Sequence, residues 1–470
     1  MNRYRRAWRI KRVQLGARNE RGAALIAVTI LGVILTSVVA VSTANTIHGY
    51  NLATANQRRE ASFQAAEAGV QDYVSKVTDD GTYFLRFVHP AESTRRSASF
   101  VSVAAGSAWD GSLGWTYPTA KNAWRSLPNG FEYNLEIVPP TNGSVGVKVI
   151  ATGRKTGSKT EWRTLEVVVR PASVADFSYV SNTDQVFGTG ATTDGKIYTG
   201  IDTAGIAHNL THYGMAYGSL YAEGQVLGMD SSRLFNDSTI YDSTTNPSIR
   251  SKVGQALNFN LFTNALVDIR AASATGLLLD DVSADGWRLS FHDDRTITVE
   301  QCAETSPWNG LADGSVNCWP YSIEPMPANG AIYSGQSVLV QGTVKGRATV
   351  ASNANIVIGA DLLYEDVTKD VLGLIARDNV LIPTWAPNDL TVSASLIAQT
   401  GSYRSQVPYQ TKSGLYRHIG SAASNVSGYM TMFNSRSYEY DTKLLLLPPP
   451  FFPTFGDKYT VVSFREVVSQ

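Results

Sequence analysis

The residues most suited to chemistry in this sequence are histidines and clustered carboxylates. His208 and His212 lie four residues apart, a spacing that would place both on one face of a helix, but the glutamate of a zinc-protease motif is absent between them. Gly205, Gly214 and Gly218 surround the pair and favour a loop. The two histidines therefore do not predict a metal site or a general base.

Acidic side chains gather in three places, where they could form a general acid and base pair or hold a metal ion. Serine, glycine and further aspartates beside the first two clusters are typical of turns, which favours a structural role. The third cluster leaves open a glycan-cleaving site with paired carboxylates on neighbouring strands. The clusters are Asp280-Asp281, His292-Asp293-Asp294, and the group Asp361, Glu365, Asp366 and Asp370.

The motifs that mark nucleophilic, phosphate-transfer or dinucleotide chemistry are absent. The sequence has no G-x-S-x-G elbow, no P-loop and no dinucleotide fingerprint. We therefore expect a protein that is not an enzyme, with no catalytic residue, no metal and no cofactor. An anchored enzyme acting on surface polysaccharide is the alternative that the third acidic cluster leaves open.

Two cysteines, Cys302 and Cys318, are the only ones in the chain, and Pro307, Gly310 and Gly314 lie between them. Outside the cytoplasm such a pair is readily oxidised. A disulfide closing this loop would stabilise the fold by about 3 kcal/mol in the chain-entropy model. We expect a disulfide here, with two free thiols as the alternative.

A membrane-spanning stretch decides where all of these residues must lie. Residues 23–41 are uncharged and largely apolar, and as a helix they would extend about 28 Å, close to the hydrocarbon thickness of a bilayer. A cleaved secretory signal ending near Val41-Ser42-Thr43-Ala44 is the alternative. Before the span, Glu20 is the only acid, against eight basic residues: Arg3, Arg5, Arg6, Arg9, Lys11, Arg12, Arg18 and Arg21.

This excess of positive charge predicts the orientation of the chain, because cytoplasmic flanks of spans are the ones enriched in Lys and Arg. The leader, residues 1–22, is expected to stay in the cytoplasm. No second stretch of comparable length and apolarity follows, so we expect a single-pass membrane protein whose later domains lie outside, on the cell surface.

The helical pattern continues past the span. Residues 53–77 contain no proline and are rich in alanine, which favours helix. Spacings of three and four residues place one apolar stripe on a single face, which predicts packing on the following domain. The stripe consists of Phe63, Ala66, Val70, Tyr73, Val74 and Val77.

Two motifs in this helical region resemble the PilX-type pilus assembly proteins, which belong among the minor type IV pilins and pseudopilins. One is Glu20-Arg21-Gly22-Ala23-Ala24-Leu25-Ile26, similar to the junction between leader and hydrophobic helix in that family. The other is Phe63-Gln64-Ala65-Ala66-Glu67-Ala68-Gly69, which resembles the family's helix signature and is the more specific of the two.

The resemblance implies a function and a processing site. In type IV pilins a prepilin peptidase cuts after the last glycine of the leader, which corresponds to Gly22, so that Ala23 would begin the mature chain. Pilins usually have an aromatic residue at that first position and Glu at the fifth, where this chain has Ala23 and Ala27. The family signature further places Phe63, Glu67 and Gly69 in helix packing.

The small and hydroxyl residues of the span are predicted to let neighbouring helices approach closely. They are Thr29, Gly32, Thr36 and Ser37. The predicted partners are accordingly other pilins, the membrane and a prepilin peptidase. A surface glycan or host ligand for the outer domain is left open.

After the helix, residues 79–171 are expected to form a small pilin-like α+β region. Residues 79–128 are interrupted by glycine and proline, and three strand patterns follow at 131–138, 145–151 and 162–169. These strands predict an antiparallel meander that Pro171 ends.

The segment 172–470 is expected to form a large β-rich domain, partly a right-handed parallel β-solenoid. Four similar triplets recur after 25, 22 and 22 residues, and repeats of that length are typical of solenoid coils, with a β-sandwich as the alternative. A second ladder, Ile356-Val357-Ile358 and Val380-Leu381-Ile382, is interrupted by Tyr403-Arg404-Ser405 in the third coil. The triplets are Thr349-Val350-Ala351, Leu374-Ile375-Ala376, Leu396-Ile397-Ala398 and His418-Ile419-Gly420.

The apolar end of this segment, residues 444–453, contains four leucines, two phenylalanines and four prolines, and it is too short to span a membrane. We expect it to cap a hydrophobic end of the domain, with a membrane-associated patch as the alternative.

Net charge excludes one class of partner. The full chain is neutral, but residues 23–470 hold 32 basic and 39 acidic side chains, a net charge of −7. Non-specific nucleic-acid binding depends on clustered Lys and Arg, so no nucleic-acid partner is expected.

The sequence as a whole predicts an α+β protein made of a leader (1–22), a transmembrane and amphipathic helix (23–78), a small pilin-like antiparallel β head (79–171) and a β-rich outer domain (172–470). The predicted function is a membrane-anchored minor pilin that acts in type IV pilus assembly and in surface display or adhesion. A pseudopilin of a type II secretion system is the alternative from the same class.

Overall fold

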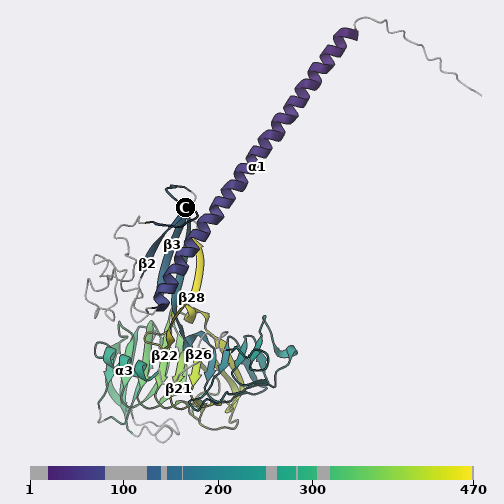
Figure 1. The fold of residues 1–470 in the computed structure, drawn as a ribbon. Helices are drawn as coiled ribbons and strands as arrows, with labels where there is room; N and C mark the ends of the chain where they lie inside the picture. Colours follow the sequence, from purple (N-terminus) through teal and green to yellow (C-terminus); the bar gives the residue numbers. More distant parts are fainter. Residues whose placement is uncertain are drawn as a thin grey trace, which may run out of the picture.

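The fold is known from a computed structural model that describes residues 20–79, 124–138, 146–160, 162–249, 262–281, 284–303 and 318–467. Most of the leader and the glycine-rich stretch after the helix lie outside the described residues. The first element is α1 (Glu20–Asp79), a single helix of 60 residues. Its amino-terminal half projects away from the rest of the molecule, and its carboxyl-terminal half packs on a small sheet (Figure 1).

The small sheet confirms the predicted antiparallel meander. Its strands are β1 (Arg125–Ser126), β2 (Phe131–Val138), β3 (Val147–Lys155) and β4 (Arg163–Ser173), and each pairs with the next in antiparallel fashion. The sheet core contains Val149, Val167 and Val169, which alternate with solvent-facing residues as expected for a sheet covered on one face.

A fifth strand, β28 (Thr454–Val467), comes from the far end of the chain and pairs antiparallel with β4. The sequence division at residue 171 had placed this segment with the large β-rich part. Pro171 does not end β4 as predicted, because β4 runs on to Ser173 and Tyr459 lies opposite Pro171 in the ladder. The ladder shifts register between Thr454 and Tyr459, which accommodates a residue that has no N–H to donate.

In its described residues, the large β domain, residues 174–453, contains the remaining strands, one helix and three short 3₁₀ turns. The helix is α3 (Phe262–Ser273), and the turns are η5 (Val174–Asp176), η6 (Ser231–Arg233) and η8 (Thr442–Leu445). The strands of its first half are β5 (Tyr179–Ser181), β6 (Gln185–Phe187), β7 (Ala191–Thr193), β8 (Ile197–Thr199), β9 (Leu210–His212), β10 (Met215–Ala216), β11 (Leu220–Ala222), β12 (Val226–Leu227) and β13 (Ile240–Asp242).

The second half is built from longer strands. They are β14 (Leu277–Leu279), β15 (Gly286–Phe291), β16 (Thr296–Cys302), β17 (Cys318–Pro325), β18 (Ala331–Ser334), β19 (Ser337–Val344), β20 (Arg347–Ser352), β21 (Ile356–Tyr364), β22 (Val371–Ala376), β23 (Val380–Ile382), β24 (Leu390–Ala398), β25 (Tyr403–Ser405), β26 (Lys412–Ser424) and β27 (Phe433–Tyr440).

Strand pairing shows an unexpected path of the chain. The first half steps outward through the parallel pairs β5–β8, β8–β11 and β11–β13. The second half begins at β14 and steps back through β18, β20, β22, β24 and β26, again in parallel. β26 then pairs with β5, so the last coil of the second half joins the first coil of the first half. The chain therefore enters and leaves this domain near its middle.

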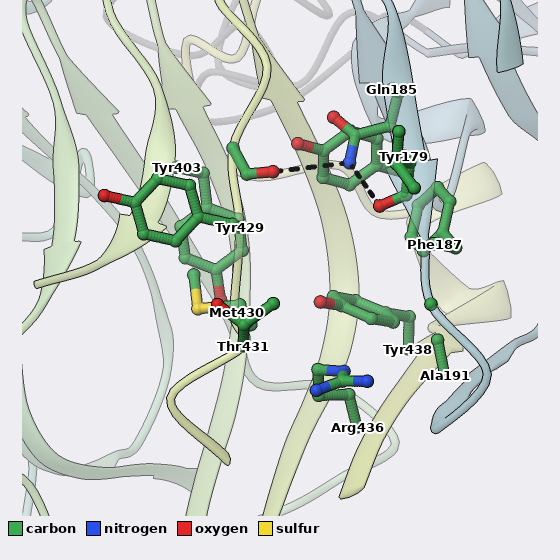
Figure 2. Close-up of a pocket in the computed structure, with 13 residues that line it drawn as sticks. Tyr179, Gln185, Phe187, Ala191, Tyr403, Tyr429, Met430, Thr431, Arg436 and Tyr438 are labelled. Atoms are coloured by element: carbon green, nitrogen blue, oxygen red, sulfur yellow. Dashed lines mark hydrogen bonds between the residues drawn. The ribbon is translucent and has the colours of Figure 1, made fainter. Parts of the chain in front are cut away.

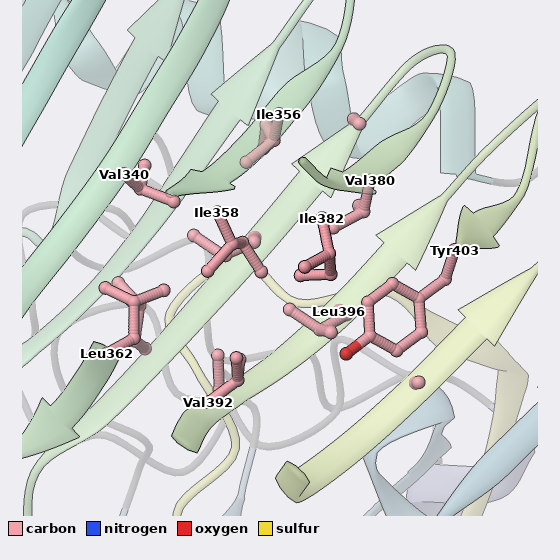
Figure 3. Packing of buried hydrophobic residues seen from close by; sticks show 14 of the residues in the cluster. Val340, Ile356, Ile358, Leu362, Val380, Ile382, Val392, Leu396 and Tyr403 are labelled. Carbon is pink, nitrogen blue, oxygen red and sulfur yellow. The ribbon is translucent and has the colours of Figure 1, made fainter. Parts of the chain in front are cut away.

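Two stacks of side chains follow these parallel ladders. On the inner side, Val350 pairs with Leu374, and Leu374 with Leu396, all fully buried. The predicted second ladder also forms, because Ile356 pairs with Val380. Figure 3 shows Ile356, Ile358, Val380, Ile382 and Leu396 close together in this core. Each ladder buries the apolar side chains of successive parallel strands against one another.

Three details of the predicted ladders differ from the structure. The first triplet is shifted by one residue, because Val350 and not Thr349 lies opposite Leu374. Tyr403, expected to interrupt the second ladder, continues it: β25 pairs with β23, and the Tyr403 ring is buried inside. The fourth predicted triplet is out of register, because Ile397 lies opposite Ala423 and Ile419 lies opposite Ser393. β26 is 13 residues long, so pattern spacing alone could not select which part of it continues the stack.

The outer side of the main ladder is covered by two segments from elsewhere in the chain. Leu266 and Ile269 of α3 pack on it, as do Leu444 and Phe452 of the apolar end segment. Pro449 and Phe452 contact Gly373, whose missing side chain leaves them room. The segment 444–453 thus covers a sheet face and does not cap an end, which accounts for its apolar composition.

Candidate functional site

The free half of α1, residues 25–52, is the most unusual surface of the described chain. Every residue in it is exposed, and its large apolar side chains are 51–73% exposed, among them Leu25 and Tyr50. At about 1.5 Å per residue it extends roughly 42 Å. Soluble proteins rarely leave so large a contiguous apolar surface uncovered, so this half requires lipid or other helices around it. It is the one helix, among the described residues, long and apolar enough to cross a membrane.

The threonine hydroxyls of this half and the hydroxyl of Ser37 donate to carbonyls of the same helix. Thr36 donates to the carbonyl of Gly32 (Oγ1···O 2.8 Å), Ser37 to that of Val33 (2.7 Å) and Thr43 to that of Val39 (2.8 Å). In lipid an unsatisfied hydroxyl would cost free energy, because no water is present to bind it. The hydroxyl residues are therefore compatible with an apolar environment.

Small residues set the close contact between α1 and the small sheet. A side chain at Gly153 of β3 would lie 2.1 Å from the Ser62 carbonyl oxygen and 2.5 Å from the Ala66 nitrogen. At Gly69, a side chain would meet the Tyr133 ring at 2.7 Å. The signature motif therefore supplies small residues at this contact. The apolar stripe is buried as predicted at Ala66, Val70, Tyr73 and Val77, and Phe63 and Val74 are partly buried against the same core.

Asp72 fixes the lower end of the helix on the sheet. Its carboxylate accepts from Tyr133 Oη (3.1 Å) and pairs with Arg125 Nη1 (3.0 Å) and with Lys76 Nζ (3.1 Å). Burial of the phenol, together with the negative charge of Asp72, raises the pKa of Tyr133 above its usual range. Tyr133 therefore acts as a neutral donor at any ordinary pH. The sequence analysis missed this cluster, because nothing local links Asp72 to a strand sixty residues later.

The chain passes between the small sheet and the large β domain twice, once after β4 and once before β28. Both connecting segments contact Arg170. Its guanidinium is fully buried and donates to the carbonyls of Leu445 (Nε···O 2.9 Å) and Pro171 (Nη1···O 2.9 Å) and to both carboxylate oxygens of Asp176. Asp176 also accepts from the Ser173 backbone nitrogen at 2.8 Å. One side chain thereby holds the entering segment and the returning segment together.

The other sequence-predicted helix residues have varied surroundings. Gly22 and Ala23 lie in the first turns of α1, and their processing stays a prediction. A side chain at Gly32 would meet nothing within 4 Å, so its close neighbours could only be other molecules. Phe63 packs edge-on against Phe464 of β28, with ring centroids 6.1 Å apart, and Glu67 is half-buried beside the sheet.

Cys302 and Cys318 are joined by a disulfide, with their Cα atoms 4.1 Å apart. They are opposite residues in the antiparallel pair of β16 and β17. The bridge therefore links two adjacent strands at the point where the intervening loop leaves them. Most of that loop lies outside the described residues.

The predicted histidine and carboxylate candidates form no common site. His208 contacts Asp184 (Nδ1···Oδ1 3.1 Å), whereas His212 lies in the core, stacked on Phe187 at 5.1 Å and bonded to Thr193 (Nε2···Oγ1 3.0 Å). Burial lowers the pKa of His212 to about 4. Among the described residues no group of three or more His, Cys, Asp or Glu is placed to hold a metal ion.

The acidic groups mostly serve turns. Asp370 is buried and accepts from the backbone nitrogens of Gly346 (2.8 Å) and Asp366 (2.7 Å), and Asp361 accepts from the Thr391 nitrogen (2.8 Å). Asp294 likewise accepts from Thr296, and Asp280 pairs with Arg270. These contacts are typical of aspartates in turns and favour the structural role over a carboxylate pair.

An aromatic recess lies where the two halves of the large β domain join (Figure 2). Tyr179, Phe187, Tyr403 and Tyr438 line it with Arg436, and Gln185 closes one side by donating to the Gly428 carbonyl (Nε2···O 3.4 Å). Its volume is about 50 Å³, enough for a few water molecules. Ligand pockets are usually several times larger, so this recess is better explained as a seam of the core.

Comparisons with known proteins give little further information. No protein-family model and no curated protein matches the chain. One solved structure that resembles it is the crystal structure of the competence-associated pilin ComZ from Thermus thermophilus, with 13% sequence identity, coverage of 87% of this chain and 98% of that chain, and a TM-score of 0.28. This TM-score is too low for the likeness to support a function.

Proposed function

We propose that this chain is a minor pilin-like protein that anchors in the membrane through α1 and enters a type IV pilus through the same helix. The observation that carries this proposal is the free half of α1, which exposes a continuous apolar surface and is joined without a break to a half that packs on a sheet. A cleaved signal peptide would not need to share one helix with the folded head.

In this proposal the free half moves from the bilayer into a bundle of helices from other pilins. Both surroundings are apolar, so the side chains from Leu25 to Val41 stay covered throughout the transfer. The absence of a side chain at Gly32 and the internally bonded Thr36 would let a neighbouring helix approach closely. We also propose that the chain is one of the PilX-type assembly proteins and that it is cleaved after Gly22.

The large β domain is proposed to be a β-solenoid that projects away from the bundle and displays a surface outside the cell. Successive strands pair in parallel, each with the strand one repeat further along the chain, and this arrangement supports a solenoid. Adhesion would then depend on side chains at the turns between coils, since the ladder residues are buried.

Replacement of Gly32 tests the assembly role. Gly32→Leu is expected to reduce the number of surface pili strongly, because the leucine fills the space that a neighbouring helix would occupy. Gly32→Ala is the matched control and should leave piliation close to wild type, since alanine is still small. Pili are counted by electron microscopy in strains with equal protein levels in the membrane fraction. Normal piliation with Gly32→Leu would contradict the proposal.

A further inference from the structure

A second recess of the large β domain carries positive charge, in contrast to the acidic chain around it. It lies where three turns stack: the turn before β18, the turn between β19 and β20, and the turn between β21 and β22. Its volume is about 380 Å³, within the range of ligand sites. Four cationic side chains line it, namely Arg295, Lys345, Arg347 and Lys369.

The charges in this recess are unevenly balanced. Lys345 pairs with Glu365 (3.4 Å) and Lys369 with Asp366 (2.6 Å), but these are solvent-exposed pairs of the kind that contribute little. Asp370 lines the recess, yet backbone nitrogens already bind both of its oxygens. Within the described chain, neither Arg295 nor Arg347 has a carboxylate at ion-pair distance.

Arg347 is half-buried and forms the anchor of this site. Its Nη2 donates to the Pro448 carbonyl (2.9 Å), while its Nε is buried and has no hydrogen-bond partner in the described structure. Burial also lowers the pKa of this guanidinium below its usual range. A partly buried cation without a counter-charge is costly, and an oxyanion in the recess would supply that charge.

Arg295 faces the same space from another turn. Its backbone has a φ of +71°, and its guanidinium nitrogens lie 3.9 Å from the position that a side chain at Gly346 would occupy. The glycine therefore leaves room in front of this guanidinium. Because Arg295 and Arg347 come from separate coils, a single ligand could contact both only at this corner.

Apart from the polar Asn329, the remaining wall of the recess is apolar and favours a ligand with an apolar face over a bare anion. Met326, Pro327, Ala328 and Pro450 provide flat apolar surface beside the cations. We propose that this recess binds an acidic sugar residue, with its carboxylate or sulfate on Arg347 and Arg295 and its ring against the apolar wall. This inference is independent of the proposed role in pilus assembly.

A duplex nucleic acid fits the observations less well than a sugar. The cations form one compact recess and not a stripe along the surface, and residues 23–470 carry a net charge of −7. Duplex binding depends on many phosphate contacts over an extended basic surface. Short duplex DNA is therefore the competing probe in the test.

The test measures binding of D-glucuronate, D-glucose and a short duplex DNA to the full-length protein in detergent micelles by calorimetry, in low-salt buffer free of sulfate and phosphate. Glucuronate is expected to bind with a Kd of about 1 mM or tighter, and glucose much more weakly. Arg347→Gln and Arg295→Gln should each weaken glucuronate binding about tenfold or more, as for loss of a charged hydrogen bond.

Controls separate this result from misfolding. Lys196→Gln removes an exposed cation from the same domain and should leave binding unchanged. Arg295 is exposed, so its variant is expected to keep the wild-type thermal midpoint even if Arg347→Gln does not. Equal affinity for glucose, no glucuronate binding by the wild type, unchanged affinity in a folded Arg295→Gln variant, or tighter binding of DNA that the same variants abolish would each overturn the proposal.

Discussion

Removal of the Arg170 side chain is expected to loosen the whole junction between the small sheet and the large β domain. In Arg170→Met, the Asp176 carboxylate keeps only the Ser173 nitrogen as a donor, although its side chain is just 14% exposed. The carbonyls of Leu445 and Pro171 lose the same donor. The variant thus creates an uncompensated buried charge and weakens both chain crossings at once.

The magnitude follows from the class of interaction. Breaking a buried ion pair by removing one partner costs about 3–5 kcal/mol, since the other charge stays buried. With a denaturant slope of about 2–3 kcal/mol per molar urea, the unfolding midpoint should fall by about 1–2 M. The unfolding midpoint of Arg170→Lys should lie between those of Arg170→Met and the wild type, because lysine keeps the charge but loses the two-pronged contact with Asp176.

The measurement is urea unfolding of the full-length protein in detergent micelles, followed by near-UV circular dichroism. Arg465→Met is the matched control, since Arg465 pairs with Glu166 at 3.0 Å in the same sheet but is 67% exposed. That control should cost less than about 1 kcal/mol. If Arg170→Met shifts the midpoint no more than Arg465→Met does, the junction is not held by this side chain and the reasoning fails.

Three further predictions follow from the same structure. Burial lowers the pKa of His212 and of His418 to about 4, from an ordinary value of 6.5. Between pH 4 and pH 6.5 the unfolded chain therefore binds more protons than the folded chain. The free energy of unfolding should be highest above pH 6.5 and fall toward pH 4, by up to about 3 kcal/mol for each histidine. A urea midpoint that does not change over this pH range would contradict the prediction. Gly153→Val should destabilise the small sheet by about 1–3 kcal/mol or more, because its side chain would meet helix backbone, and thermal unfolding checks this against the wild type. Amino-terminal sequencing of protein from pili should begin at Ala23, whereas an intact leader on assembled protein would contradict cleavage after Gly22.

The local part of this fold could be predicted from the sequence. The long helix and its apolar stripe follow from spacings of three and four residues, and β2 begins and ends at the predicted residues 131 and 138. The pairing of Leu374 with Leu396, 22 residues later, also follows the predicted repeat, whereas the predicted alignment of the first triplet is one residue off, because Val350 and not Thr349 lies opposite Leu374. In each case the signal lies within a window of a few turns or coils, where periodicity reports burial directly.

The parts that could not be predicted depend on contacts between distant segments. Gly153 carried a signal, because a glycine inside a strand often marks a close approach of another backbone, yet the sequence alone does not say that the approaching backbone is at Ser62. The Arg170 site carried no signal in the sequence, because an arginine after three valines looks like the end of a strand. Its partners Asp176 and Leu445 are brought to it by the tertiary path of the chain. The cationic recess shows the same limit, since Arg295 and Arg347 come together only through the tertiary path of the chain.

The path of the chain gives Arg170 its importance. The large β domain is inserted between β4 and β28, two neighbouring strands of the small sheet, and Ser173 on the entering segment donates to the Pro453 carbonyl on the returning one (Oγ···O 3.0 Å). A domain joined by one crossing could swivel about a single backbone. Two crossings bonded to each other at Ser173 and Arg170 resist such rotation, because any swivel must break buried hydrogen bonds on both segments. The free half of α1 and the outer domain are thus connected through a continuous packed path, from Phe63 on the helix to Phe464 on β28 and through the junction to the coils.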